Sequence, residues 1–133
     1  MKAAIPTLCL VIAVAAGCKV EDGVYLPGCI AYAGDSIELA NGRFEWDRFT
    51  DAVEVDASGN VVDPHPDYPK VGTATVTGDS VVLTDDDGNV VDTRALVTHA
   101  GRPYLLTAAE RAEWQRTGLI PACALVLGGH RSN

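Results

Sequence analysis

The chain has 133 residues, of which 47% are hydrophobic, and it carries 18 acidic side chains against 10 Lys and Arg. This length suits one ordinary domain, and the hydrophobic content excludes a disordered chain. The net charge of −8 excludes nucleic acid as the expected partner, because phosphate binding requires a basic surface. We therefore expect a single acidic globular domain.

The N-terminal segment has the pattern of an export signal. Lys2 supplies a positive charge, and the apolar run that follows, residues 3–16, is interrupted only by Pro6 and Thr7. Such a run is typical of a secretory signal peptide and is too short to cross a membrane as a helix. We predict that residues 1–17 are a signal peptide and that the mature protein is exported.

Residues 14–18 read Val-Ala-Ala-Gly-Cys and resemble the lipobox of bacterial lipoproteins, although that family usually carries Leu where this chain has Ala15. The resemblance implies that Cys18 becomes the first mature residue and carries the lipid, so that residues 18–22 tether the domain to a membrane. In this family an Asp after the cysteine often marks inner-membrane retention. Lys19 stands there instead, which favours the outer membrane and a domain facing the periplasm. The alternative is simple secretion, with cleavage after Ala15.

The cysteine count favours the lipoprotein. Cys9 leaves with the signal peptide, and simple secretion would strand an odd number of cysteines in an oxidising compartment. If Cys18 carries lipid, Cys29 and Cys123 remain as one pair. A disulfide between them would close nearly the whole domain and contribute on the order of 4 kcal/mol in the chain-entropy model. The alternative is two buried free thiols.

A β-hairpin is the first element expected in the domain. The Asn-Gly pair at 41–42 lies between two alternating segments, residues 36–40 and 43–49, and Asn-Gly is the strongest short hairpin signal. A two-residue turn sets the register and places Leu39 opposite Phe44. Apolar side chains therefore meet across the hairpin, as a core-facing side requires.

The rest of the domain reads as short strands, tight turns and one helix. The proline-rich residues 63–69 are expected to form a loop. Residues 34–39 and 78–83 share a Gly-Asp-Ser start, and each reads as a turn followed by a strand, either by duplication or by chance. Thr107 and Glu110 form a capping box and Gly118 suits the C-terminal cap, so a helix of about ten residues fits between them. The other strands expected are residues 71–77, 80–84, 90–98, 103–106 and 122–127, the last of which contains Cys123.

These elements predict a mainly β fold with one short late helix. A small antiparallel meander that curls into a barrel, or a curved sheet closed by the helix, would limit exposed strand edges. We expect residues 23–129 to form this single domain and residues 130–133 to be a C-terminal tail.

The hairpin register also predicts an acidic face. Glu38 lies directly opposite Glu45, on the face away from Leu39, and Asp47 shares that face. Because carboxylates that face each other across two strands repel, we expect compensation from Arg43 or Arg48, from a cation, or from a basic partner. The alternatives are an ordinary solvated face and a catalytic carboxyl pair.

Other sites have less support in the sequence. Asp63, His65 and Asp67 alternate and could bind a metal, but the prolines around them favour a rigid connector, so no metal site is assigned. Residues 85–89 are rich in Asp but lack the ligand spacing of an EF-hand, and they read as a hairpin turn. We find no G-x-S-x-G motif and no phosphate-binding glycine loop, so we assign no catalytic residue and expect no cofactor.

The sequence thus predicts an exported, lipid-anchored protein of the cell envelope with a binding or structural role. Its acidic surface suits a basic protein partner, as in an inhibitor or immunity-type protein, or it serves as an envelope component. The alternative function is a small hydrolase that uses the paired carboxylates Glu38 and Glu45.

Overall fold

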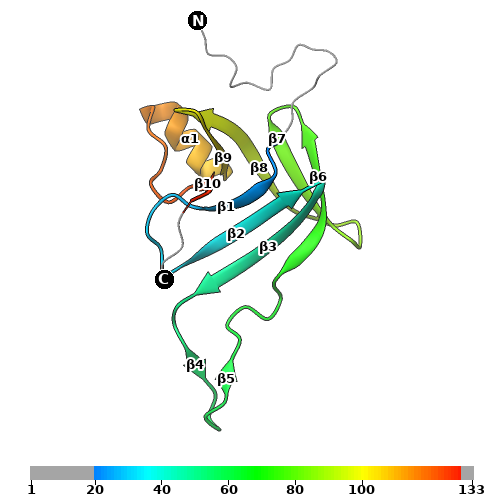
Figure 1. Ribbon diagram of the computed structural model, residues 1–133, viewed down its shortest axis with the longest axis vertical. Coiled ribbons are helices and arrows are strands. Elements are labelled where there is room, and N and C mark those ends of the chain that lie inside the picture. The colour runs from blue at the N-terminus through cyan, green and yellow to red at the C-terminus, as the bar shows by residue number, and fades with distance from the viewer. Residues whose placement is uncertain (1–19, 130–133) are drawn as a thin grey trace, which may run out of the picture.

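The structure is a computed structural model that describes residues 20–129, and it is mainly β, with 52% of residues in strands. Eight antiparallel strands close into a barrel in the order β1-β10-β9-β8-β7-β6-β3-β2 (Figure 1). A two-stranded sheet, β4-β5, and one helix complete the fold. Of the two architectures expected, the barrel is therefore confirmed. The elements are β1 (Gly23–Pro27), β2 (Ala33–Ala40), β3 (Arg43–Thr50), β4 (Glu54–Val55), β5 (Val61–Val62), β6 (Lys70–Thr77), β7 (Ser80–Asp85), β8 (Val90–His99), β9 (Arg102–Leu106), α1 (Ala108–Thr117) and β10 (Leu125–Leu127).

The β2–β3 hairpin has the predicted register, with Leu39 paired to Phe44. The two turn residues, Asn41 and Gly42, have φ angles of 53° and 78°. Positive φ at both central residues is what the favoured two-residue hairpin turn requires, which explains the Asn-Gly pair. The signal segment 1–17, Cys18 and the tail 130–133 lie outside the described residues.

Two short strands, β1 and β10, close the barrel by pairing with each other. β1 was not predicted, because Gly and Pro at its two ends weaken the strand pattern. β10 is shorter than predicted: residues 122–124 are not in a strand, because the chain turns there and the Ala124 N–H donates to the Pro121 carbonyl oxygen. Cys123 lies in this turn and forms a disulfide with Cys29, which follows β1. The predicted pairing of these cysteines is confirmed, and the bridge joins the two segments that flank the closing strand pair.

Residues 36–39 and 80–83 both lie in strands as predicted, but the turn predicted before each strand is present only at residues 78–79. Gly78 lies in the turn between β6 and β7 with φ 62°, whereas Gly34 lies inside β2, so the turn predicted at Gly34 is wrong. Glycine is suited to this position because a Cβ there would come within 3.2 Å of the Pro27 ring and 3.5 Å of the Phe49 ring.

Strand β9 separates two apolar clusters. Leu105 and Leu106 are consecutive residues and both are fully buried. Since neighbouring strand residues point to opposite faces, this requires cover on both sides of β9, and α1 packs against the outer side of β8 and β9 (Figure 1). The cluster that contains Leu105 comprises Tyr25, Ile37, Leu39, Phe44, Val81, Leu83, Leu105 and Leu125. The cluster beside α1 comprises Ala95, Val97, Leu106 and Ala124.

The helix begins and ends as predicted. The Thr107 hydroxyl oxygen accepts from the Glu110 backbone N–H at 3.1 Å, and a Glu110 carboxylate oxygen accepts from the Thr107 N–H at 2.9 Å. Gly118, with φ 77°, ends the helix, and its N–H donates to the Trp114 carbonyl oxygen. These caps satisfy backbone groups that a helix end leaves without partners.

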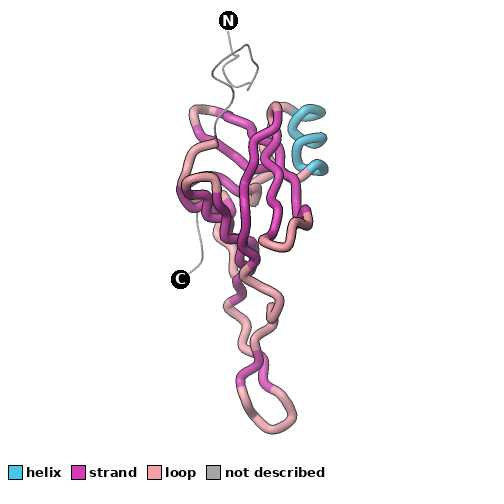
Figure 2. The backbone as a smooth tube through the Cα atoms, turned by 90° about the vertical axis from the view of Figure 1, so that its right-hand side faces the viewer, coloured by secondary structure: helices cyan, strands magenta, loops and turns pink. Residues whose placement is uncertain are grey.

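A long excursion between β3 and β6 projects from one end of the barrel (Figures 1 and 2). We call residues 51–69 the arm. It contains β4 and β5, which pair only through Glu54–Val62 and Val55–Val61. The prolines at 63–69 were correctly read as a non-strand segment, but the short strand pair before them was not predicted.

Candidate functional site

The acidic face predicted from the hairpin register is present on the outer side of β2 and β3. Glu38 pairs with Glu45, and both side chains are exposed. Val24 of β1 pairs with Glu38, and Val71 of β6 pairs with Glu45, so the four residues form one row across four strands. The two valines are 39% and 41% exposed. We call this the acidic row: a carboxylate pair flanked on both sides by accessible apolar groups.

Neither arginine that was expected to compensate the pair does so. Arg43 forms a bidentate ion pair with Asp86, with nitrogen–oxygen distances of 3.0 and 3.2 Å. Arg48 points to Asp35, with its Nε 3.0 Å from the Asp35 Oδ1. Among the described residues, no hydrogen bond or ion pair to the Glu38 or Glu45 carboxylate is present. The repulsion between the two carboxylates is therefore met only by solvent within this part of the chain.

The ion pair of Arg43 with Asp86 is exposed on both sides. The hydrogen bonds from Arg43 lower the pKa of the Asp86 carboxyl, and the same contact raises the pKa of Arg43. Because both side chains are more than half exposed, the pair contributes little to stability. It nevertheless engages the Arg43 guanidinium with Asp86 rather than with the acidic row.

Asp47, the third acidic residue predicted for this face, is exposed and pairs with Ser36 in the neighbouring register position. Its carboxylate accepts from the backbone N–H of Arg48 at 2.8 Å. Asp47 thus extends the acidic face along β3, but part of its hydrogen-bonding capacity is used locally.

The arrangement suits binding better than acid–base chemistry. A general acid among paired carboxyls needs an environment that removes water and raises its pKa. Glu38 and Glu45 instead stand on the open side of the sheet, exposed to solvent. Accessible apolar groups beside fixed negative charge are suited to Lys or Arg side chains, whose aliphatic stems pack while the head group pairs.

The residues considered for a metal do not converge. Asp63 uses its carboxylate to accept from the His65 backbone N–H at 2.8 Å. The His65 ring stands edge-on to Tyr68, with 6.4 Å between ring centroids. Within residues 20–129, no three His, Cys, Asp or Glu side chains are grouped so that they could hold a metal ion.

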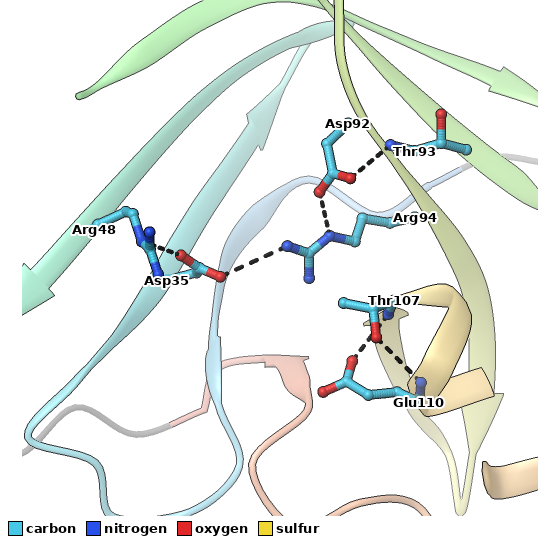
Figure 3. A network of polar contacts seen from close by, with 7 residues as sticks. All are labelled: Asp35, Arg48, Asp92, Thr93, Arg94, Thr107 and Glu110. Atoms are coloured by element: carbon cyan, nitrogen blue, oxygen red, sulfur yellow. Dashed lines mark hydrogen bonds and ion pairs between the residues drawn. The ribbon is translucent and has the colours of Figure 1, made fainter. Parts of the chain in front are cut away.

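Sequence reasoning missed an ionic network inside the barrel, at the end from which the arm projects. Arg94 of β8 is 5% exposed and contacts Asp92 at 2.6 Å on its own strand. The Arg94 Nη2 atom lies 3.6 Å from the Oδ2 atom of Asp35 on β2, although β8 and β2 are not neighbours in the sheet. Figure 3 shows the side chains of Asp35 and Arg94 pointing toward each other between these strands, with Arg48 on the far side of Asp35. The network thus links opposite walls of the barrel.

The network is balanced in charge but not fully hydrogen-bonded. Two carboxylates, Asp35 and Asp92, face two guanidinium groups, Arg48 and Arg94. The Arg48 contact is an ion pair without hydrogen-bond geometry, so the buried Asp35 Oδ1 accepts no hydrogen bond from residues 20–129. The indole N–H of Trp46 is also buried and has no acceptor within the same residues, and Arg94 stacks over the Trp46 ring at 5.8 Å.

Tyr68 connects this network to the arm. Its ring packs edge-on against Trp46, with 5.4 Å between centroids. Arg48 and Lys70 both place their charged groups over the Tyr68 ring, at 5.7 and 5.0 Å from its centroid. Such cation–π contacts add to the aromatic packing. The base of the arm is therefore held by the same side chains that close this end of the barrel.

At the opposite end of the barrel, residues that precede β1 contact the domain directly. Val20 packs against the core cluster, and the Asp22 carboxylate accepts from the Asn41 N–H at 3.1 Å. The Tyr25 hydroxyl donates to the Glu21 carbonyl oxygen at 2.7 Å. Burial raises the pKa of Tyr25, and the charges of Glu21 and Asp22 add to this effect. Residues 20–22, predicted as part of the tether, are thus bonded to the barrel.

No helix between residues 20 and 129 has the length and apolar character needed to cross a bilayer. A comparison of the chain with protein-family models, with curated proteins and with solved structures finds no match.

Proposed function

We propose that this protein is an exported, lipid-anchored protein of the cell envelope that binds a basic protein partner through its acidic row. The observation that carries the proposal is the uncompensated pair Glu38 and Glu45, which faces solvent while the nearby arginines pair elsewhere. A carboxylate pair held together by strand register is destabilising on its own. A Lys or Arg from a partner would relieve that repulsion. The free energy that the repulsion costs the folded chain would then be recovered on binding.

The apolar ends of the acidic row support a protein partner rather than a simple cation. Val24 and Val71 stand beside the carboxylates with about two fifths of their surface accessible. A hydrated metal ion gains nothing from these methyl groups, whereas the stem of a basic side chain does. An inhibitor or immunity-type role, in which the protein neutralises a basic enzyme, requires a surface of this kind.

The lipid anchor rests on the sequence of residues 14–18 and on the disulfide. With Cys29 and Cys123 bridged, Cys18 has no cysteine partner in a mature chain that has lost Cys9. Because Val20 already packs on the barrel, a lipid on Cys18 would hold the domain close to the membrane surface. A Cys18→Ser variant should therefore be released from the membrane fraction, and continued acylation or membrane retention would refute the anchor.

The binding proposal is tested by a double variant and a matched control. Glu38→Gln with Glu45→Gln removes the pair, and Asp87→Asn with Glu113→Gln removes the same charge from exposed positions elsewhere. In affinity capture from envelope extract, a basic protein should be retained by the wild-type chain and the control but lost by the Glu38 and Glu45 variant. Equal retention by all three would exclude the acidic row as the binding surface.

A stability measurement separates binding from folding. Removal of a directly opposed like-charge pair should raise the free energy of unfolding by about 0.2–1 kcal/mol. A variant that is more stable yet no longer captures the partner would show that the pair serves binding. The alternative hydrolase would instead predict loss of a measurable hydrolytic activity in the single variants Glu38→Gln and Glu45→Gln.

A further inference from the structure

The arm concentrates negative charge. Residues 51–69 contain five acidic side chains and no Lys or Arg, in a chain with 18 acidic and 10 basic residues. The five are Asp51, Glu54, Asp56, Asp63 and Asp67. Such a segment attracts a positively charged surface and speeds its approach.

The arm also exposes apolar side chains that the fold does not use. Val53, Val55 and Val61 are 76%, 60% and 76% exposed. Val55 and Val61 are directly paired, so their side chains stand on the same side of the β4–β5 sheet. No core cluster includes them. These methyl groups would be buried if a partner molecule covered them.

The arm is held in shape at its tip. The Asp56 carboxylate accepts from the backbone N–H groups of Ser58 and Asn60, at 2.8 and 3.0 Å. The Asn60 backbone bond contributes most to the lowering of the Asp56 pKa. Gly59 supplies the positive φ of 85° that the turn needs.

The arm is also fixed at its base. The Asp51 N–H donates to the Tyr32 carbonyl oxygen at 2.7 Å, and Tyr68 packs between Trp46, Arg48 and Lys70. An isolated two-stranded hairpin is only marginally stable in water. Fixing both ends reduces the conformational entropy that the arm would otherwise lose when it binds.

The arm lies on the side of the barrel away from the start of the described chain. Figure 1 shows β1, the first strand, beginning toward the upper part of the barrel and β4 and β5 beyond the lower end, and Figure 2 shows the arm extending clear of the barrel walls. An anchor at the N-terminus would thus leave the arm directed away from the membrane. β3, which carries Glu45, runs directly into the arm.

We propose that the arm enters an apolar groove with a basic rim on the same partner that the acidic row contacts. The inference rests on the proposed function, since it assigns a second contact to that partner. The paired valines fill the groove and the surrounding carboxylates meet its rim. A second copy of this chain fits less well, because two arms each carrying five acidic and no basic residues repel. An anionic membrane surface is disfavoured for the same reason.

Site-specific photocrosslinking of the full chain in its native cells tests the contact. Val61 is replaced with p-benzoylphenylalanine, and the matched control carries the same group at Val90, which is 62% exposed on the barrel. We expect an adduct from position 61, and not from position 90, with a protein of net positive charge. An adduct with lipid, with a second copy or with an acidic protein would overturn the proposal, as would no adduct from position 61 or equal adducts from both positions.

Binding measurements with the purified crosslinked protein then separate the two contacts. Val55→Ser with Val61→Ser should weaken its dissociation constant by at least about tenfold, whereas Val90→Ser should leave it unchanged. If only the Glu38→Gln, Glu45→Gln variant weakens binding, the arm is not a contact and the proposed function stands. If only the arm variant does, the acidic row fails and the arm contact stands. Circular dichroism of each variant checks that the barrel remains folded.

Discussion

Replacement of Arg94 with Met tests whether the ionic network joins opposite walls of the barrel. Arg94 is 5% exposed and contacts Asp92 and Asp35, which lie on β8 and on the non-adjacent β2. Met keeps most of the side-chain volume but removes the charge and every donor. Asp35 would then keep only Arg48, whose side chain is partly exposed, and Asp92 would keep no guanidinium partner among residues 20–129.

The expected loss in the free energy of unfolding follows from the burial of Arg94. Removal of one partner from a buried ion pair costs about 3–5 kcal/mol, because the remaining charge is left without compensation. Arg48→Met is the matched control, since Arg48 contacts the same Asp35 carboxylate but is 45% exposed. A largely exposed ion pair is worth about 1 kcal/mol or less. The two substitutions at one carboxylate should therefore differ severalfold in their effect on stability.

Thermal and urea unfolding, followed by circular dichroism and tryptophan fluorescence, measure this difference. In a domain of this size each kcal/mol shifts the midpoint by about 4–8 °C, so Arg94→Met should lower Tm by more than about 12 °C. Arg48→Met should lower it by about 8 °C or less. Equal shifts for the two variants, or a neutral Arg94→Met, would show that the network does not join the barrel walls.

Three further predictions concern the Cys29–Cys123 disulfide, the turn of the arm, and the close approach of Gly72 to the backbone of β7. Cys29→Ser with Cys123→Ser should lower the free energy of unfolding by about 4 kcal/mol in urea titrations, and an unchanged midpoint would contradict a closing role for the bridge. The pKa of Asp56 is lowered from 3.8 in the folded chain. The contribution of the Asp56 carboxylate to the stability of the arm's turn is therefore present above about pH 4 and is lost as the pH falls through the lowered pKa. The amide protection factors of Ser58 and Asn60, which donate to the Asp56 carboxylate, should therefore fall as the pH drops through the lowered pKa, and should be low in Asp56→Ala at neutral pH; protection factors that do not depend on pH would argue against this turn. Gly72→Ala should destabilise the barrel by about 1–3 kcal/mol or more, since its Cβ would overlap the backbone of β7, and a wild-type midpoint would mean that β6 and β7 can separate freely.

The candidate binding groups lie where the fold gains least from them. The acidic row costs stability through repulsion, and the arm exposes valines that no core cluster includes. By contrast, the side chains that hold these parts in place are buried or paired, as with Arg94 at the barrel end and Tyr68 at the base of the arm. A rigid barrel that presents strained or exposed groups is the arrangement expected of a binding protein.

The local elements of this protein could be predicted because their signals lie within a few residues of one another. The Asn-Gly turn at 41–42 sets its own register, and Thr107 with Glu110 satisfies the first backbone donors of the helix. The opposition of Glu38 and Glu45 followed from that register alone. The Cys29–Cys123 pairing was predicted from the export expected for the chain, since an odd thiol is disfavoured in an oxidising compartment.

The tertiary structure decided what depends on distant segments. β1 was not recognised in the sequence and β10 was predicted too long, because both strands are defined by pairing with each other where the barrel closes. Arg43 looked available to the acidic pair, but the turn after β7 places Asp86 within its reach. Arg48 is paired with Asp35 by the hairpin register itself, on the face opposite to Glu45. Strand alternation predicts which side of a sheet a residue occupies, but not what stands across the barrel from it. The sequence by itself therefore determined the hairpin, the helix and the acidic face, whereas the tertiary structure decided that Arg43 pairs with Asp86 and Arg94 with Asp35, because these partners come from segments far apart in the chain.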